Sequence, residues 1–198
     1  MDRAGIPHLT VTELAKLIET KQVSPVEAVE AYLDRIEQVN PVVNAYVTVC
    51  AEEARRDARQ AEEEIQQGHY RGPLHGVPVA IKDQIHTKGI RTTDGSKLRA
   101  TFVPEEDATV MANLKKAGAI LLGKLNMSEF ALGDPVSSAS GAARNPWDLE
   151  RSPGTSSTGS GAATAAHLCA TSLGEDTGGS IRGPAANCGL VGLRPTWG

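Results

Sequence analysis

The sequence predicts an α/β fold in which helices flank a mixed, largely parallel sheet, preceded by a helical N-terminal segment. Two observations carry this prediction. Short apolar runs alternate with helical patterns in residues 71–198, which is the order of strand–helix–strand units. Residues 1–70 carry helical patterns almost throughout. With 198 residues, 40% of them hydrophobic, the chain is long enough to bury one core.

Three helices are expected in the N-terminal segment. Residues 10–13 fit a capping box, and residues 24–27 supply a serine N-cap, a first-turn proline and a glutamate at the third position. The second helix is predicted to end at residues 40–41, where Asn is followed by Pro. The third spans residues 51–67, and its dense Glu and Arg content is typical of a solvent-facing helix rather than of a partner-binding surface.

The remaining residues are predicted to form the sheet and its covering helices. We expect strands at residues 77–82, 119–123, 171–173 and 190–193. We expect helices at residues 107–117, 128–132, 160–170 and 180–187, and an irregular segment at residues 133–158. The last strand has nothing after it to cover it, so the sheet is expected to be incomplete. We therefore predict one domain over residues 1–198, with a truncated α/β catalytic core at residues 71–198.

Composition and charge argue against several classes of protein. A net charge of −4 and an aromatic content of 4% are unlike a nucleic-acid-binding surface. The three cysteines are far apart and form no CxxC pair, and the histidines are scattered, so neither a disulfide scaffold nor a metal site is expected. We find no signal-peptide pattern and no apolar run of about 18 residues. We therefore expect a cytoplasmic protein.

A segment built of Ser, Gly, Thr and Pro lies at residues 152–161. A flexible linker has this composition, but an apolar helix of small residues follows directly, and linkers rarely lead straight into core helices. A phosphate-binding loop would need a lysine after Gly159, where the chain has Ser160. A nucleophile elbow would need a glycine in place of Thr158. A loop whose own backbone binds a ligand is the remaining interpretation beside the linker.

A second Gly-rich segment, GEDTGGSIRGPA, spans residues 174–185. Its residues 177–180 place successive backbone amides in a tight turn before a helix, where they can face a developing oxyanion. The alternative is an ordinary turn in which Ser180 caps the helix and Arg182 faces solvent. This segment alone leaves both interpretations open.

Lys82 ends the apolar run GVPVAIK. A lysine in this position ordinarily extends its amine to solvent. If it is instead buried beside a serine, it can act as a base, because serine–lysine pairs are an alternative to the Ser-His-Asp triad. Its pKa would then have to fall by about 3 units from about 10.4. Burial and hydroxyl partners can produce such a shift.

Together, these features closely resemble the amidase signature family. The resemblance rests on Lys82, the Ser156–Ser157 pair and Ser180, in that order, with DTGGSIR and CGLVGLRPT around and after the last serine. It extends over nearly the whole chain, through SPVEAVEAYLDRIEQVNPVVNAYVTV, LHGVPVAIKD, GAILLGKLNMSEFA and RNPWD. The chain corresponds to the N-terminal part of that family, whose members are considerably longer.

What the resemblance implies is a Ser-cisSer-Lys triad. Ser180 would be the nucleophile, Lys82 the base that finally takes its proton, and Ser156 the serine that relays the proton between them. Ser156 would follow a cis peptide bond. The chain departs from the family pattern at Thr155 and Thr158, where glycines are common, so the loop is expected to be stiffer.

The resemblance also implies groups that support this triad. Backbone amides would form an oxyanion hole, and three further side chains would support the site through hydrogen bonds. The oxyanion-hole residues are Thr177, Gly178 and Gly179, and the supporting residues are Ser157, Asp176 and Arg182.

The implied activity is hydrolysis of the C–N bond of a carboxylic amide through an acyl-enzyme, with no metal or cofactor. We expect a small-molecule amide as substrate and neither nucleic acid nor membrane as a direct partner, and a homodimer is left open. One alternative is the glutaminase subunit of a tRNA-dependent amidotransferase. Gly183 argues against it, because those subunits commonly have glutamine at this position. The others are an inactive truncated fragment and, more distantly, a phosphate-binding protein.

Overall fold

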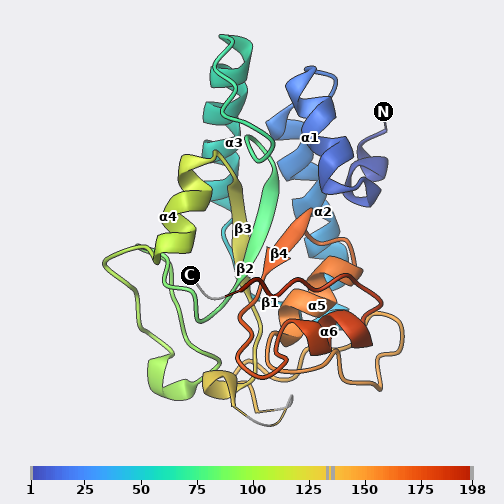
Figure 1. Cartoon of the computed structure of the whole chain (residues 1–198), viewed down its shortest axis with the longest axis vertical. Coiled ribbons are helices and arrows are strands. Elements are labelled where there is room, and N and C mark those ends of the chain that lie inside the picture. Colours follow the sequence, from blue (N-terminus) through green and yellow to red (C-terminus); the bar gives the residue numbers. More distant parts are fainter. Residues whose placement is uncertain (1, 133, 135–136, 197–198) are drawn as a thin grey trace.

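The computed structural model describes residues 2–132, 134 and 137–196, and it confirms the predicted α/β class. Within these residues four strands form one sheet in the order β1–β3–β2–β4 (Figure 1). Strand β2 (Pro78–Lys82) runs parallel to both β3 (Ile120–Leu125) and β4 (Thr171–Leu173). Strand β1 (Tyr46–Val49) runs antiparallel to β3. The sheet is therefore mixed and largely parallel, as predicted.

The N-terminal helices begin where the capping signals predict. Both predicted capping boxes are present, before α1 (Val11–Glu19) and before α2 (Pro25–Val43). The charged helix α3 (Ala51–Gln66) also matches its predicted range, and a short 3₁₀ helix, η1 (Arg3–His8), precedes α1. The predicted end of α2 is wrong, because the helix continues through its proline. It ends instead at Asn44, whose left-handed conformation (φ 49°) closes the last turn.

Strand β1 is an element that the sequence analysis missed. It is four residues long and lies between two long helices, so the helical pattern around it conceals it. The strand is held in place by side chains from elsewhere. Asn40 accepts a hydrogen bond from the Tyr46 backbone N–H (2.8 Å), and the Tyr46 hydroxyl donates to the Leu168 carbonyl oxygen (2.9 Å). The contact between Tyr46 and Leu168 joins residues 122 positions apart, so it leaves no local signal in the sequence.

The core elements after residue 70 match their predicted types, with shifted ends. They are α4 (Thr109–Lys116), η3 (Glu129–Ala131), α5 (Thr158–Ala165) and α6 (Arg182–Asn187). The short 3₁₀ helix η2 (Lys97–Arg99) was not predicted. Helix α5 starts earlier and stops earlier than predicted, because His167 adopts a left-handed conformation (φ 58°) and turns the chain toward β4. Of the predicted irregular segment 133–158, residues 133, 135 and 136 lie outside the described residues.

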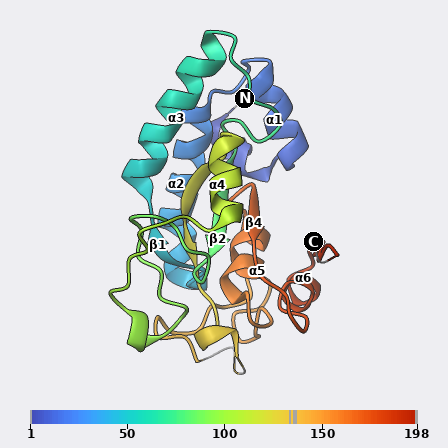
Figure 2. The same ribbon diagram turned by 60° about the vertical axis from the view of Figure 1, so that its left-hand side comes forward.

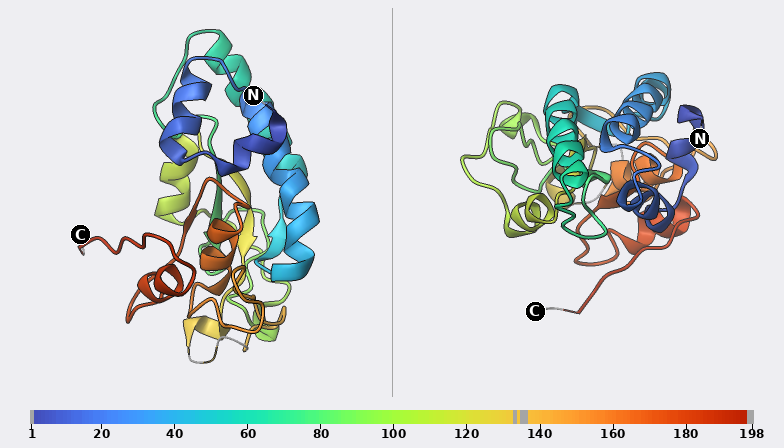
Figure 3. Two further views of the ribbon diagram at one scale, coloured as in Figure 1. Left: turned by 90° about the vertical axis from the view of Figure 1, so that its right-hand side faces the viewer. Right: turned by 90° about the horizontal axis from the view of Figure 1, so that it is seen from above.

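The predicted strand at residues 190–193 is wrong. This stretch has no regular secondary structure, and Val191 and Leu193 are 99% and 77% exposed. A strand needs a hydrogen-bonded neighbour, and no described strand lies beside it. Figure 3 shows the C-terminal segment leading away from the rest of the molecule. The prediction failed because it was based on apolar composition alone, and the described residues include no neighbouring strand with which this segment could pair.

Helices α2, α3 and α5 supply much of the apolar core that covers the sheet. Figure 2 shows α2 and α3 running alongside each other, and the two helices contact one another along their length. Arg35 of α2 donates to the Ala166 carbonyl oxygen at the end of α5 (2.7 Å), which joins α2 to α5. The N-terminal segment is thus packed into the same core as the strands.

We expect alanine at Gly159 to destabilise the protein. A Cβ atom at this position in α5 would overlap both the Ala45 carbonyl oxygen and the Asn126 backbone nitrogen. Relieving this overlap requires backbone movement, at a cost of about 3 kcal/mol in the free energy of unfolding. This exceeds the gain of ~1 kcal/mol that alanine has over glycine in a helix. The change is measured as a lower urea midpoint.

Gly183→Ala in α6 is the matched control for this prediction. Its Cβ atom would meet only the Thr155 carbonyl oxygen, at 3.4 Å, which is an ordinary contact distance. The control midpoint should stay close to that of the unaltered protein. Equal midpoints for the two variants would contradict the close approach of α5 to β1 and β3.

Candidate active site

The candidate site lies at the carboxyl ends of the three parallel strands. Lys82 is the last residue of β2, Asn126 follows β3 directly, and the segment that begins at Gly174 follows β4. Parallel strands bring their carboxyl ends to one edge of a sheet, where open α/β folds bind ligands. Asn126 also accepts a hydrogen bond from the Gly159 backbone N–H (2.8 Å), which anchors the start of α5 at the same edge.

Lys82 is buried and directly contacts a serine. Its side chain is fully buried, and its Nζ donates a hydrogen bond to Ser156 Oγ at 2.7 Å. The interpretation in which this amine extends to solvent is therefore wrong, because the strand ends beneath the two Gly-rich segments. Burial lowers the pKa of the Lys82 amine, and the negative charge of Glu175 opposes that shift. The amine is thus moved toward the neutral form that a base requires.

The Gly/Ser segment is part of the folded core and not a linker. Ser156 and Ser157 are both buried, and the peptide bond between Thr155 and Ser156 is cis. The Ser156 carbonyl oxygen accepts from the Ser128 N–H (3.1 Å), and the Ser157 N–H donates to the Ser180 carbonyl oxygen (3.2 Å). The Ser157 hydroxyl also donates to the Glu175 carbonyl oxygen (3.3 Å). This segment is therefore joined through its backbone to the second Gly-rich segment.

Asp176 organises the second Gly-rich segment. Its carboxylate accepts backbone N–H groups of Gly179 (2.7 Å), Ile181 (3.1 Å) and Arg182 (3.2 Å). The Arg182 guanidinium donates two further hydrogen bonds to it, both at 3.0 Å. These bonds, led by that from the Arg182 side chain, hold the pKa of Asp176 far below its ordinary value. The ordinary-turn alternative fails in one respect, because Ile181 and not Ser180 occupies the N-cap of α6.

The backbone amides of this turn are not equivalent. The Gly179 N–H of the predicted oxyanion-hole set donates to Asp176 and is not free to bind a ligand. Among the described residues, no hydrogen-bond acceptor engages the N–H groups of Thr177 and Gly178. Only these two amides of the predicted set are therefore available to an oxyanion.

Ser180 faces the same cavity as Ser156. This open cavity of about 810 Å³ is lined by segments around Phe130, by the Gly/Ser segment and by the turn at residues 175–180. No hydrogen bond joins the Ser180 hydroxyl to any residue within the described ranges. Lys82 and Ser156 are thus in contact, whereas Ser180 lines the same cavity as Ser156 without a hydrogen bond to either residue. Catalytic hydrogen bonds are often long in unliganded sites and tighten when substrate binds.

Glu175 is a site residue that the sequence analysis missed. Its Oε2 lies 3.4 Å from Lys82 Nζ, and its Oε1 accepts a hydrogen bond from the Thr177 hydroxyl at 2.7 Å. A signal for it was present, because Glu175 places a carboxylate within a segment otherwise rich in glycine, next to the predicted supporting residue Asp176. Its importance depends on Lys82, which is far away in the sequence.

Comparison with known proteins identifies the family of this chain. The model of the family described as Amidase matches residues 27–198. The chain belongs to the amidase family. The A-type subunit of glutamyl-tRNA(Gln) amidotransferase from Geobacter metallireducens is 55% identical over 191 residues, which are 96% of this chain and 39% of that protein. The protein of the same name from Carboxydothermus hydrogenoformans is 52% identical over 192 residues, which are 96% of this chain and 40% of that protein.

Solved structures place the chain in the same family. The peptide amidase from Stenotrophomonas maltophilia superposes with a TM-score of 0.90 at 36% identity, covering 94% of this chain and 40% of that one. The A-type subunit of glutamyl-tRNA(Gln) amidotransferase from Thermotoga maritima superposes with a TM-score of 0.81 at 39% identity. The match covers 98% of this chain and 39% of that one. A structure named fatty acid amide hydrolase superposes with a TM-score of 0.87 at 30% identity, and the match covers 93% of this chain and 33% of that one. This amidase chain therefore spans less than half the length of these relatives.

A second buried lysine lies near the end of β3 in this amidase chain. Lys124 Nζ donates to the Ile85 carbonyl oxygen (2.6 Å) and the Thr92 hydroxyl (2.7 Å), and lies 4.0 Å from Asp83 Oδ1. The Asp83 carboxylate accepts the Thr93 N–H at 2.9 Å. Burial lowers the pKa of Lys124 to about 8 and raises that of Asp83. This pair ties the loop after β2 to β3, on the face of the sheet opposite Lys82.

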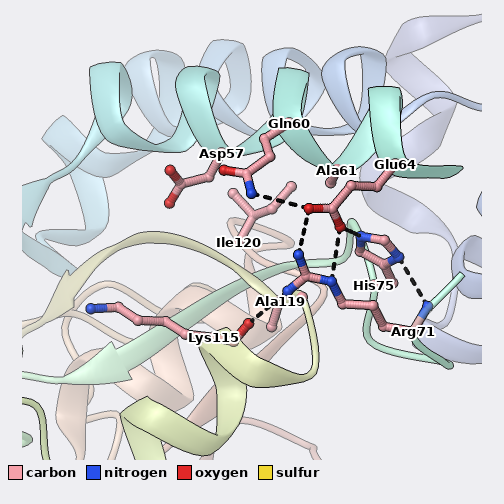
Figure 4. Close-up of a pocket in the computed structure, with 10 residues that line it drawn as sticks. Asp57, Gln60, Ala61, Glu64, Arg71, His75, Lys115, Ala119 and Ile120 are labelled. Carbon is pink, nitrogen blue, oxygen red and sulfur yellow. Dashed lines mark hydrogen bonds and ion pairs between the residues drawn. The ribbon is translucent and has the colours of Figure 1, made fainter. Parts of the chain in front are cut away.

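A second cavity lies near the amino ends of β2 and β3, at the other end of the strands from Lys82. It has a volume of about 170 Å³ and is lined partly by α3 (Figure 4). Glu64 accepts two hydrogen bonds from the Arg71 guanidinium, at 2.8 and 2.5 Å. The buried His75 accepts the Arg71 N–H at Nδ1 (3.1 Å), and its Nε2 lies 3.2 Å from Glu64. Glu64, Arg71 and His75 are thus paired with one another, which connects α3 to the segment before β2.

Neither a metal site nor a membrane-spanning helix has a candidate in the described ranges 2–132, 134 and 137–196. No group of three or more His, Cys, Asp or Glu side chains there is arranged to hold a metal ion. No helix in those ranges combines the length and the apolar character needed to span a bilayer.

We expect Asp176→Asn to destabilise the amidase fold most strongly above about pH 4, and progressively less as the pH falls below that value. The folded-state pKa of Asp176 is depressed, so its carboxylate stabilises the fold above its unfolded pKa of ~3.9, and this contribution disappears as the pH falls toward the folded value. Urea unfolding of both proteins at pH 7 and pH 3 measures the difference.

Asp34→Asn is the control, because its ion pair with Arg3 (2.9 Å) is about half exposed. Such exposed pairs contribute little to stability. A difference between the Asp176→Asn variant and the unaltered protein that stays constant from pH 7 to pH 3 would contradict the assigned role of the Asp176 carboxylate.

Proposed function

We propose that this chain carries the nucleophile and base of an enzyme that hydrolyses carboxylic amides. Ser180 is the nucleophile, Ser156 relays its proton, and Lys82 takes that proton. One observation carries the proposal: the fully buried Lys82 amine donates to Ser156 Oγ at 2.7 Å, beside the cavity that Ser156 shares with Ser180. A buried amine with a lowered pKa that contacts a serine beside a cavity is the arrangement expected of a catalytic base.

The first step forms an ester on Ser180. Its hydroxyl oxygen attacks the amide carbonyl carbon while its proton passes to Ser156, whose own proton passes to the neutral amine of Lys82. The carbonyl oxygen becomes an oxyanion, which the N–H groups of Thr177 and Gly178 stabilise. The C–N bond then breaks, and the proton held by Lys82 returns through Ser156 to the departing nitrogen. Ammonia or an amine leaves, and the acyl group stays on Ser180.

The second step releases the acid. Water attacks the ester carbonyl carbon and gives a proton to Lys82 through the same serine, and the proton then returns to the Ser180 oxygen as its bond to the acyl group breaks. The products are a carboxylic acid and the free serine. Each transfer uses only side chains and water, so the proposed mechanism requires no metal and no cofactor.

We propose a small-molecule amide as the substrate. The relatives named above include a peptide amidase and a fatty acid amide hydrolase, so the same fold serves amides of different size. A cytoplasmic location belongs to the proposal, and the three buried free cysteines are compatible with a reducing compartment. Homodimer formation stays a prediction, as does the division into a helical N-terminal segment and a catalytic core.

Covalent labelling with a fluorophosphonate tests the proposed site. The reagent phosphonylates an activated serine and releases fluoride, and peptide mapping identifies the residue. We expect the label on the peptide that contains Ser180. A label on another serine, or none on a protein that unfolds cooperatively, contradicts the proposal. A molten product without a sharp unfolding transition would favour the inactive fragment instead.

A second candidate is the glutaminase subunit of a tRNA-dependent amidotransferase. Identity of 55% to an A-type subunit of glutamyl-tRNA(Gln) amidotransferase favours it, whereas Gly183 in place of glutamine favours a stand-alone amidase. Both candidates use the same nucleophile and base, and they differ in where the amide comes from. Ammonia release from glutamine, measured with and without partner subunits, separates them. Release that depends on the partners supports the glutaminase, and hydrolysis of simple amides without partners supports the stand-alone enzyme.

A further inference from the structure

Glu175 places a carboxylate beside the proposed base. We propose that Glu175 is a positioning residue that sets the pH range in which Lys82 acts, an inference that rests on the proposed function. Its carboxylate Oε2 lies 3.4 Å from Lys82 Nζ, and its own carbonyl oxygen lies 3.5 Å from the same nitrogen. Residue 175 thus faces the amine with both its backbone and its side chain.

The Glu175 side chain is held toward the amine by its neighbours. The Thr177 hydroxyl donates to Glu175 Oε1 at 2.7 Å, which leaves Oε2 for Lys82. The backbone of Glu175 is also fixed, because its carbonyl oxygen accepts the Ser157 hydroxyl (3.3 Å) and its N–H donates to the same Ser157 oxygen (3.4 Å). The carboxylate therefore bridges the proposed base and the proposed oxyanion-hole turn.

Glu175 is the one ionisable side chain among the described residues that line the 810 Å³ cavity. The other lining residues are small, polar without charge, or apolar. Its side chain is 35% exposed, whereas that of Lys82 is fully buried. A single carboxylate at the mouth of an otherwise uncharged cavity acts on the buried amine with little competition from other cavity charges.

Other charged groups near Lys82 have a weaker effect on the protonation of its amine. Asp176 also favours the charged form of Lys82, but its carboxylate is occupied by Arg182 and lies near Arg194. Asp83 and Lys124 lie on the opposite face of the sheet, because Lys124 is in register with Ile81 and successive strand residues alternate faces. Glu175 is therefore the group whose charge most directly retains the proton on Lys82.

The chemical consequence is a constraint on the first step of the reaction. Lys82 must be neutral before it can accept the proton from Ser156. Burial favours the neutral amine, and the Glu175 carboxylate favours the ammonium ion, so the two effects oppose each other. Removing the negative charge should extend the activity toward lower pH. Shortening the side chain while keeping its charge should leave the pH range closer to that of the unaltered protein.

The test measures the rate of Ser180 phosphonylation by a fluorophosphonate from pH 5 to pH 10, with Glu175→Gln, Glu175→Asp and the unaltered protein. Glutamine keeps an acceptor for the Thr177 hydroxyl and removes the charge. We expect the midpoint of the pH profile to lie about 1 pH unit lower in Glu175→Gln than in the unaltered protein. This is the smallest pKa shift usually produced by a close opposite charge, and it is expected because Glu175 is partly exposed to solvent. Below both midpoints its labelling should be about 10-fold faster than that of the unaltered protein.

Glu106→Gln is the matched control. Glu106 is exposed and lines a further cavity, to which Glu175 also contributes, and it makes no contact with Lys82. Its midpoint should equal that of the unaltered protein. An unmoved midpoint in Glu175→Gln overturns the inference, whether or not the labelling is slower at every pH, because slower labelling alone indicates a structural role. Absence of Ser180 labelling in the unaltered protein overturns the proposed function itself, which is a separate result.

Discussion

Ser180→Ala is expected to abolish amide hydrolysis and fluorophosphonate labelling. The nucleophilic oxygen forms the bond to the acyl group, and no other serine can replace it at that position in the turn. Removing a member of such a triad lowers kcat by about 10⁴-fold or more. The variant should fold normally, because the Ser180 hydroxyl makes no hydrogen bond with the described residues and only its backbone carbonyl binds Ser157. Hydrolysis is measured by ammonia release and folding by thermal unfolding.

Ser140→Ala is the control for the Ser180 variant. Ser140 is exposed, and its backbone, not its hydroxyl, contacts Asn44. The control should keep full activity. A Ser180→Ala protein that retains more than about a tenth of the original rate would show that the nucleophile is assigned wrongly, since triad members ordinarily contribute several orders of magnitude.

Lys82→Ala is expected to remove nearly all activity, for a different physical reason. The nucleophile remains, but the proton of its hydroxyl has no base to receive it through Ser156. General-base catalysis contributes about 10² to 10⁴-fold, so a slow residual rate should persist. Labelling of Ser180 should become slow and not absent, which distinguishes loss of the base from loss of the nucleophile.

Lys82→Met separates this chemical effect from a folding defect. Alanine leaves a cavity at a fully buried position, whereas methionine fills most of the space without an amine. Both variants should lose activity to the same extent, although the alanine variant is the less stable. Lys116→Ala, an exposed lysine at the end of α4, is the control and should be fully active. A Lys82→Met protein with near-normal hydrolysis would refute the assignment of the base.

Local signals in the sequence predicted much of the fold. The capping boxes before α1 and α2 are confirmed, because each depends on residues three positions apart. The short strands β2, β3 and β4 were also predicted from their apolar composition. The errors occurred where distant residues decide the outcome. Strand β1 exists because it pairs with β3, and residues 190–193 are not a strand because no described strand pairs with them.

The candidate site shows the same division. Lys82, Ser156 and Ser180 were singled out from their surroundings in the sequence and from a family resemblance. Glu175 was missed, since its significance arises only from a lysine 93 positions away in the chain. The sequence also could not show which backbone N–H groups of the turn are free to bind an oxyanion. Only in the folded protein does the Gly179 N–H donate to the Asp176 carboxylate.

By itself, the sequence determined the α/β class, the starts of the N-terminal helices and the residues proposed to perform amide hydrolysis. Only the tertiary structure decided that the Lys82 amine is removed from water, that it meets Ser156, and that Glu175 lies beside it. The reason is physical. Helix caps and apolar patterns act over a few residues, whereas desolvation and charge interactions depend on which remote segments the sheet brings to one edge.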